Sequence, residues 1–440
     1  MQAQTRKMKT IRLIGCFIAM MLFGCLDALA QADVDSPYSL FGVGQVRGNA
    51  MNVRLKGMGG VANAMSSSGM INTGNPASLA KMDSLAFLFD AGVYFKTSTF
   101  STSTKRERGA NASFDYMAMA FGLTSWWKTA LGVQPYSTSG YKMVVDSYKE
   151  DVGSYSTVFK GSGGLNQAFW SNAFKLGKHF AIGANAYYVF GNTQTITTLY
   201  LPDSTYSIGS RRSLDMMASS FMFDYGLMFN AKIASDMTLS FGLTYDQSVK
   251  LRGMQTLFIR SIEEDMDTEV EYLIDTVYYS GSEKAYLTMP QGFGVGFALE
   301  KDKRWCVGAD FNWTQWSRFA REGVTENLHD SWRVAAGFEY IPTYSSVSNY
   351  FRRANYRIGG FYENGFLSLP GIDDGEHDIN KIGVTAGISL PLPRSLSKVN
   401  LALEFGQYGT QEAGLIQERY LKFEVGVSVF ERWFMKRKYK

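Results

Sequence analysis

Apolar and polar residues alternate one by one through long stretches of the chain beyond residue 84. Residues 381–390 show the pattern clearly, because Ile, Val, Ala, Ile and Leu are separated there by Gly, Thr, Gly and Ser. A period of two residues places alternate side chains on opposite faces of a β-strand. The pattern predicts fourteen strands, at approximately 84–98, 112–124, 127–139, 163–176, 178–192, 217–233, 236–250, 287–300, 303–317, 331–342, 354–363, 381–393, 398–410 and 419–432.

The length of these runs and their aromatic residues favour a membrane barrel over a soluble sandwich. The runs hold about ten residues, as membrane strands do, whereas strands of soluble proteins average about five or six. Aromatic residues gather at run ends, namely Trp126, Trp127, Trp313, Trp316, Tyr340, Trp433 and Phe434. This placement is typical of the aromatic girdles of a bilayer-spanning barrel, although ordinary sheet positions would also accept these side chains. We therefore expect an all-β protein in which residues 84–432 form a closed transmembrane antiparallel β-barrel, because closure satisfies every backbone group in hydrocarbon.

The connections between the runs alternate in length. Short turns such as Gly177 and Ala234-Ser235 contrast with long polar stretches at 140–162, 193–216, 251–286, 318–330, 364–380 and 411–418. Barrels of this class have short periplasmic turns and long external loops. The long stretches are therefore expected to be external loops, and both termini are expected on the periplasmic side.

A glycine-rich segment precedes the strands. Gly57, Gly59 and Gly60 stand near its start, and the triplet Asn75-Pro76-Ala77 stands near its end. The segment is rich in small residues and has no strand pattern, so the most economical place for residues 31–83 is inside the barrel, as a hatch or plug. Charged residues on the polar faces of the runs would then point into the lumen and pair with the plug, namely Asp224, Asp310, Arg333, Glu339, Arg357, Glu404, Lys422 and Glu424.

The first 30 residues are expected to be a signal peptide. Four basic residues within residues 6–12 precede an apolar run over 13–26, and Ala28-Leu29-Ala30 fits a cleavage site. A membrane anchor and a lipidated Cys25 are the alternatives. Cleavage lowers the formal net charge from +4 to +1, which leaves no basic stripe for nucleic acid. Export combined with these strands predicts the outer membrane of a Gram-negative cell, with residues 433–440 as a basic C-terminal tail.

Catalysis finds little support in the sequence. The histidines of the chain, His179, His329 and His377, are far apart and lack the spacing of metal ligands. Cys306 is the only cysteine after the signal, which excludes an intramolecular disulfide. The chain also has no phosphate-binding loop and no nucleophile elbow. We expect no enzyme, no catalytic residue, no metal and no cofactor, with an outer-membrane lipase as the remaining alternative.

The glycines that precede Asn75-Pro76-Ala77 and the strands that follow together resemble the FadL/TodX family of outer-membrane transporters for hydrophobic compounds. The resemblance implies a barrel of the predicted strand number, blocked by a hatch whose motif is Gly57, Gly59, Gly60 and the triplet. It also implies that an apolar ligand enters between outer loops and leaves sideways beside a kinked third strand. The third run contains Pro135, which cannot donate to a ladder and so favours a bulge or a broken edge. Pro135 is therefore the candidate lateral gate, although it would equally fit a strand end.

The expected function is passive uptake of small hydrophobic molecules, such as long-chain fatty acids, through the plugged barrel with a candidate lateral exit. The expected partners are a hydrophobic ligand and outer-membrane lipid, with no nucleic acid. One alternative is a protein-interaction platform similar to the shuttle component of type IX secretion, with a protein partner at the outer loops. The other is a general porin.

Overall fold

The computed structural model describes residues 35–432, except 49, 152, 202–207, 266–269, 347–348, 372, 374 and 394. The predicted signal peptide (1–30) and the C-terminal tail (433–440, with Trp433 and Phe434) lie outside the described residues. Among the described helices, none is long and apolar enough to cross a membrane.

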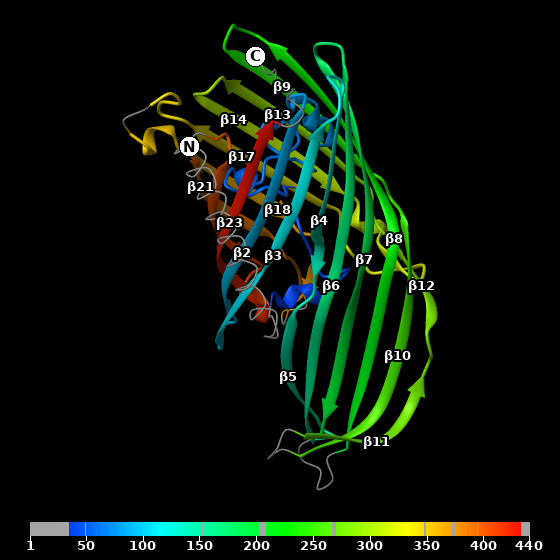
Figure 1. Ribbon diagram of the computed structural model, residues 1–440. Coiled ribbons are helices and arrows are strands. Elements are labelled where there is room, and N and C mark those ends of the chain that lie inside the picture. Colours follow the sequence, from blue (N-terminus) through cyan, green and yellow to red (C-terminus); the bar gives the residue numbers. More distant parts are fainter. Residues whose placement is uncertain are drawn as a thin grey trace, which may run out of the picture.

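Fourteen strands of the described chain form a closed antiparallel ring (Figure 1). Each strand pairs with the next along the ring, and β2 closes it by pairing with β23 from Ala86 opposite Arg432 to Ser101 opposite Gln417. The ring consists of β2 (Ala86–Ser101), β3 (Arg106–Gly122), β4 (Trp127–Thr138), β6 (Gly153–Leu176), β7 (Phe180–Tyr200), β8 (Ile208–Lys232), β9 (Met237–Asp246), β13 (Gly292–Lys301), β14 (Trp305–Thr314), β17 (Ser331–Tyr340), β18 (Asn355–Asn364), β21 (Lys381–Pro391), β22 (Lys398–Tyr408) and β23 (Gln417–Arg432). The predicted barrel and its strand number are confirmed.

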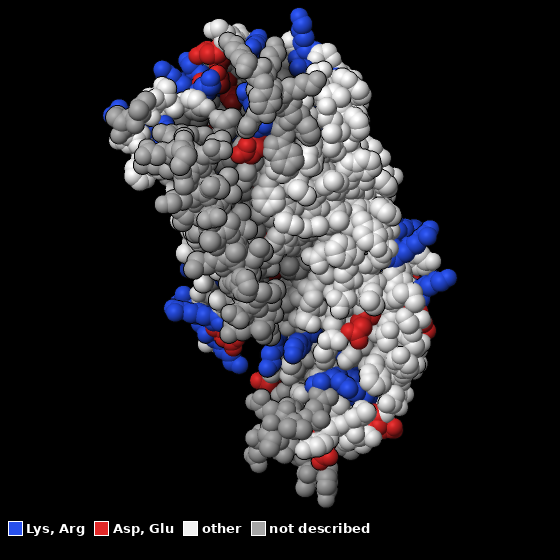
Figure 2. Space-filling view, viewed as in Figure 1, with Lys and Arg blue, Asp and Glu red and all other residues white. Residues whose placement is uncertain are grey.

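The outward face of the ring is apolar. Large side chains stand exposed at alternate strand positions, among them Phe95, Leu131, Phe221, Phe297, Phe338, Ile358 and Phe405. Figure 2 shows a broad area of the described surface without charged residues, with Lys, Arg, Asp and Glu above it and below it. Such an area matches the hydrocarbon layer of a bilayer. Trp316 departs from the expected girdle, because it is only 5% exposed and packs inside against Phe319 and Phe366.

The polar stretches expected to be external loops are largely strands. β5 (Tyr141–Lys149) and the first part of β6 occupy 140–162, while β7 and β8 extend through much of 193–216. The stretch 251–286 lies within β10 (Lys250–Asp265), β11 (Val270–Tyr279) and β12 (Glu283–Thr288). Shorter pairs follow, namely β15 (Ala320–Arg321) with β16 (Val324–Thr325), and β19 (Ser368–Pro370) with β20 (Glu376–Asp378). Short 3-10 turns complete these loops at η3 (Trp316–Arg318) and η5 (Glu412–Gly414), whereas η4 (Phe351–Arg353) lies in the β17–β18 connection at the opposite end of the barrel. Outside the bilayer, water can reach both faces of a sheet, so these strands need no apolar alternation.

Residues 35–85, called here the N-terminal segment, lie inside the ring, where Figure 1 shows them in blue. The segment contains η1 (Pro37–Leu40), β1 (Gln45–Val46), α2 (Val53–Lys56) and η2 (Pro76–Lys81). Its apolar side chains are almost fully buried, as for Leu55, Val61 and Ile71. Its backbone contacts the inward-facing residues of strands on both sides of the ring.

Candidate functional site

The three predicted hatch glycines touch the wall formed by β17, β18 and β21. The Gly59 amide donates to Thr385 Oγ1 at 2.8 Å, and its φ of +73° favours glycine. A Cβ on Gly59 would lie 2.6 Å from the Gly360 carbonyl oxygen. Gly57 approaches Gly387 in the same way, and Gly60 lies against the Arg333 guanidinium. These glycines therefore allow the segment backbone to lie directly on the barrel wall.

The Asn75-Pro76-Ala77 triplet lies on the other side of the ring, against β7 and β8. Asn75 Oδ1 accepts from the Ala77 amide at 3.0 Å, which caps η2, and Pro76 takes the first helical position. Asn75 Nδ2 donates to the carbonyl oxygens of Asn63 at 2.6 Å and Leu227 at 3.2 Å. The structure thus places the glycines and the triplet at nearly opposite walls, where they attach two different parts of the segment.

Charged side chains line one half of the interior, as expected from the polar faces of the runs. Glu339 accepts two hydrogen bonds from Arg54 of the segment, at 2.8 and 3.0 Å, and one from Arg357 at 2.5 Å. Asp310 accepts from the backbone amides of residues 62 and 63, at 2.5 and 2.8 Å. Arg333 donates to the Gly59 carbonyl oxygen at 2.7 Å. These charged residues stand on strands between β14 and β23, and we call this part of the barrel the polar half of the interior.

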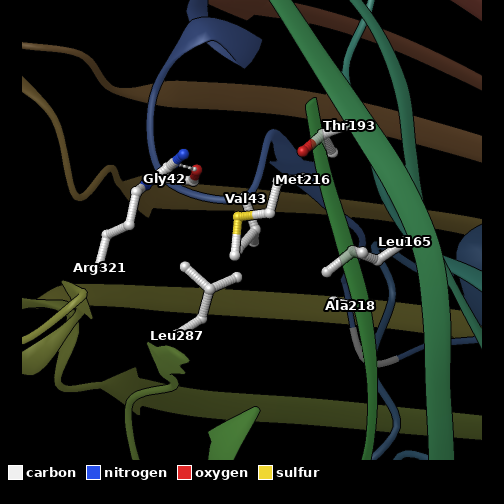
Figure 3. A pocket seen from close by; sticks show the side chains of 8 residues that line it. All are labelled: Gly42, Val43, Leu165, Thr193, Met216, Ala218, Leu287 and Arg321. Carbon is white, nitrogen blue, oxygen red and sulfur yellow. Dashed lines mark hydrogen bonds between the residues drawn. The ribbon is translucent and has the colours of Figure 1, made fainter. Parts of the chain in front are cut away.

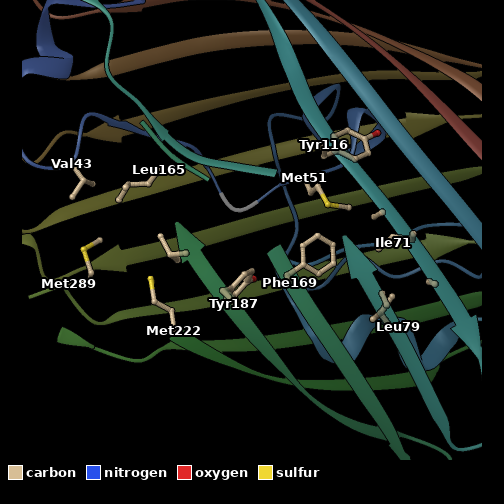
Figure 4. Packing of buried hydrophobic residues seen from close by; sticks show 14 of the residues in the cluster. Val43, Met51, Ile71, Leu79, Tyr116, Leu165, Phe169, Tyr187, Met222 and Met289 are labelled. Atoms are coloured by element: carbon tan, nitrogen blue, oxygen red, sulfur yellow. The ribbon is translucent and has the colours of Figure 1, made fainter. Parts of the chain in front are cut away.

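Apolar side chains are concentrated along β4 to β8, together with β10 and β12. Asp224 of β8, one of the charged residues expected in the lumen, also lies among them and hydrogen-bonds with Tyr187 rather than with the segment. Figure 4 shows Phe169, Tyr187 and Met222 of these strands in the same apolar cluster as Val43 of the segment. The cluster is rich in methionine, which tolerates repacking around an irregular ligand, and its methionines are Met51, Met82, Met216, Met222 and Met289. We call this region the apolar half of the interior.

A small cavity lies within the apolar half (Figure 3). The side chains that line it come from the segment, the wall and the external strands, namely Gly42, Val43, Leu165, Thr193, Met216, Ala218, Leu287 and Arg321. The cavity has room for about one water-sized molecule. A larger hydrophobic molecule would therefore have to displace the methionine side chain or the Gly42–Val43 backbone.

The barrel wall splits next to this cavity, between β3 and β4. The two strands pair only from Gly122 opposite Lys128 to Met117 opposite Val133. Beyond Val133, the remaining residues of β3 (106–116) pair with β2 alone among the described strands. Pro135 follows Val133 by two residues, and the β4–β6 register shifts between Pro135 and Ser137. The bulge that the proline favoured is therefore present at the point where β4 departs from β3.

Glycines continue the same bend into β6 and β7. Gly164 has a φ of +153°, and a Cβ there would lie 2.4 Å from the Ser137 carbonyl oxygen of β4. Gly191 of β7 lies in turn against the Gly164 carbonyl oxygen. Isolated glycines inside strands indicate close backbone approach. Gly164 and Gly191 therefore marked this bend in the sequence, but only Pro135 was identified from the sequence.

The N-terminal segment closes the split from the inside. β1 pairs with β4 in place of β3, with Gln45 opposite Thr138 and Val46 opposite Ser137. The next residue, Arg47, donates its amide to the Tyr136 carbonyl oxygen and reaches Asp115 of β3 at 2.9 Å. β1 therefore replaces the pairing that β3 no longer gives.

Asp35 adds a second attachment at this place. Its carboxylate accepts from Thr138 of β4 and lies 3.1 Å from Lys96 Nζ of β2. Burial acts to raise the pKa of Asp35, but Lys96 and the hydrogen bond from Thr138 outweigh burial and hold the pKa below its usual value. A charged Asp35 thus links the two sides of the split.

The residues considered for chemistry are scattered. His179 hydrogen-bonds the Asn230 carbonyl oxygen at a short turn, whereas His377 pairs with Asp373 at 3.0 Å in the connection between β18 and β21. Cys306 is a buried free thiol. Within the described ranges, no group of three or more His, Cys, Asp or Glu residues could hold a metal ion. The described residues thus form an apolar interior that the N-terminal segment closes.

Known structures share this architecture. The toluene transporter TbuX of Ralstonia pickettii matches with a TM-score of 0.57 and 13% identity, over 88% of this chain and 99% of that chain. The toluene transporter TodX of Pseudomonas putida gives 0.53 and 15%, over 90% and 100% of the two chains. A Pseudomonas aeruginosa FadL homologue gives 0.53 and 11%, over 89% and 100%. These likenesses concern the fold, and they confirm the predicted FadL/TodX resemblance at that level.

Sequence comparison gives a further result. No curated protein matches the chain. A family model described as BamG matches residues 9–440, nearly the whole chain. The protein therefore belongs to the BamG family and is an outer-membrane β-barrel with the fold of the FadL and TodX transporters.

Proposed function

We propose that the protein is a passive conduit for small hydrophobic molecules, such as long-chain fatty acids, and not an enzyme. The molecule would enter from the external side, occupy the apolar half of the interior and leave sideways into outer-membrane lipid. The signal peptide would direct the chain to the outer membrane of a Gram-negative cell. The neighbours in fold that are described as toluene transporters support this substrate class.

One observation carries the proposal: the cavity of the apolar half lies beside the split between β3 and β4. Leu165 lines the cavity and is the register partner of Ser137, which also pairs with β1. Burial of apolar ligand surface there would be worth about 25 cal/mol per Å². Movement of β1 would join the cavity to the split, so the segment would act as a hatch with Pro135 at the lateral gate. A general porin fits less well, because the segment packs closely against both walls.

A disulfide between β1 and β4 tests this route. Gln45 and Thr138 are directly opposite in an antiparallel pair, a spacing that a disulfide can bridge. In the Gln45→Cys/Thr138→Cys variant, oxidation should abolish uptake of radiolabelled oleate by cells lacking their own fatty-acid transporter, and a reductant should restore it. Leu369→Cys/His377→Cys is the matched control, because it joins β19 to β20 away from the split. Equal uptake by the oxidised and reduced gate variant would refute a route past β1.

A further inference from the structure

The β10–β11 hairpin extends beyond the bilayer band on the external side of the barrel. β11 lies opposite residues 258–265 of β10, and residues 258–263 of β10 pair with residues 208–213 of β8. The large lipid-facing side chains of β8 begin only at Met217, closer to the barrel. Figure 1 shows the hairpin at the far end of the long strands, and Figure 2 shows charged residues around that end. The hairpin is therefore outside the hydrocarbon layer.

One edge of β11 is open. β11 pairs with β10, and no other strand in the described part of the chain pairs with it. β12 continues along the same edge of β10, but β15 covers it, with Arg321 opposite Leu287 and Ala320 opposite Thr288. Along its other edge, the backbone of β11 therefore has no strand partner among the described residues. The Thr276 amide is satisfied within β11, because it donates to the Asp275 carboxylate at 2.7 Å.

The side chains of β11 are unusual for an open edge. All eight residues from Tyr272 to Tyr279 are exposed, and Val277 is 62% exposed. Six of the eight are large and apolar, namely Tyr272, Leu273, Ile274, Val277, Tyr278 and Tyr279. Proteins normally protect edge strands with charges, proline or bulges, because open apolar edges recruit other strands. These eight residues include no proline, and their only charge is Asp275. The register of β11 against β10 shifts twice, so bulges are the one common protection that this edge has.

We infer that the free edge of β11 binds an extended segment of another protein by β-strand addition. Such a segment would satisfy the open backbone groups and cover the apolar side chains, which is how strand addition gives both affinity and specificity. Lipid acyl chains cannot supply the hydrogen bonds, and lipid headgroups cannot supply a regular ladder of donors and acceptors together with apolar cover. Asp275 and the nearby exposed Glu263 favour a basic residue in the added strand, beside β-branched and aromatic residues.

A second copy of the chain fits this edge poorly. Two copies in one membrane are related by rotation about the membrane normal. β11 runs obliquely to the barrel axis in Figure 1, so the rotation would make β11 cross its copy rather than lie antiparallel beside it. A different protein, free to approach from the external side, has no such restriction.

Amide hydrogen exchange of the 270–279 peptide tests the inference. The exchange is measured on the full protein in detergent, in liposomes made of purified outer-membrane lipid, and in native outer-membrane vesicles. We expect exchange about tenfold slower in the native vesicles alone, because only they contain the partner. Ile274→Lys should remove this protection by placing a charge on the edge. Val324→Lys is the matched control, since Val324 is an exposed valine on the external β16.

Each other outcome overturns the inference. Equal exchange in the three preparations would mean that nothing covers the edge. Protection that also arises in the liposomes would assign the edge to lipid or to a second copy, and a dependence on protein concentration would identify the copy. Protection that survives Ile274→Lys would place the contact elsewhere. Heat-modifiable migration on gels verifies that each variant is a folded barrel.

Discussion

The polar half and the apolar half of the interior hold the N-terminal segment by different means. In the polar half, Arg54, Gly59 and the backbone of residues 62–63 are fixed by buried charged groups of β14 to β18. In the apolar half, methionine and aromatic side chains pack against Val43, and β1 adds a short backbone ladder. Buried charges demand fixed geometry, whereas methionine contacts can rearrange. The comparison indicates that residues 54–63 are held by fixed polar contacts, whereas the residues around Val43 are held mainly by contacts that can rearrange. The triplet at Asn75 stays hydrogen-bonded to β8.

The ladder between β3 and β4 is interrupted next to residues 45–47 of the segment. Closure there depends on contacts made by residues 35–47, chiefly β1, the Asp35 carboxylate and the Arg47–Asp115 pair. The polar half has a continuous ladder, as in β17–β18, which pair from Trp332 to Tyr340. Movement of residues 35–47 would therefore open the wall without dissolving the barrel. Three substitutions test this division, in decreasing order of expected effect.

Glu339→Gln should have the largest effect, because it removes the charge that neutralises both Arg54 and Arg357. Breaking a buried charge network typically costs about 3–5 kcal/mol. We expect a loss of that size in the free energy of unfolding, measured by urea titration in lipid vesicles. Residues 35–85 should also become sensitive to protease.

Glu300→Gln is the matched control for this experiment. Glu300 pairs with Lys81 of the segment at 2.7 Å, but both side chains are about one-third exposed. Exposed pairs are worth about 0–1 kcal/mol. If Glu339→Gln unfolds at the same urea concentration as Glu300→Gln, the polar half is not the anchor.

Gly59→Ala should have an intermediate effect. Alanine at a φ of +73° costs about 1–2 kcal/mol, and its Cβ would meet backbone atoms that cannot turn aside. Gly177→Ala provides the control, because Gly177 has a φ of +67° with nothing within 4 Å of its Cβ. The same urea titration should show Gly59→Ala to be about 1–3 kcal/mol less stable than Gly177→Ala. Equal losses would mean that the close approach to Gly360 has no energetic role.

Sequence reasoning recovered the parts of the fold that the bilayer dictates. Each strand of the ring has an apolar outward face, so period two revealed all fourteen. It missed β10 to β12 because their residues alternate less clearly where water reaches both faces. The open edge of β11 was hidden for the same reason, although its run of aromatic and β-branched residues from Tyr272 to Tyr279 carried a strand signal.

The site was predictable only where a residue acts locally. Pro135 predicts a bulge from its own chemistry, whereas the loss of β3–β4 pairing depends on where β1 lies, more than 80 residues earlier in the chain. The apolar half could not be predicted, because inward positions of a plugged barrel accept both apolar and charged side chains. Met216 and Met222 face inward just as Asp310 and Glu339 do. The path of the segment decides which wall of the barrel is polar. No local pattern in a single sequence reveals that path.

Pro135→Ala should have the smallest effect on stability and a clear effect on transport. Alanine supplies a backbone N–H and removes the constraint on φ, so β4 could pair with β3 beyond Val133 and narrow the split. We expect the free energy of unfolding to change by less than about 1 kcal/mol, while oleate uptake falls. Pro370→Ala, in the short external strand β19, should leave both quantities unchanged. Normal uptake by a folded Pro135→Ala barrel would show that the interruption of the ladder is structural and that the ligand leaves by another way.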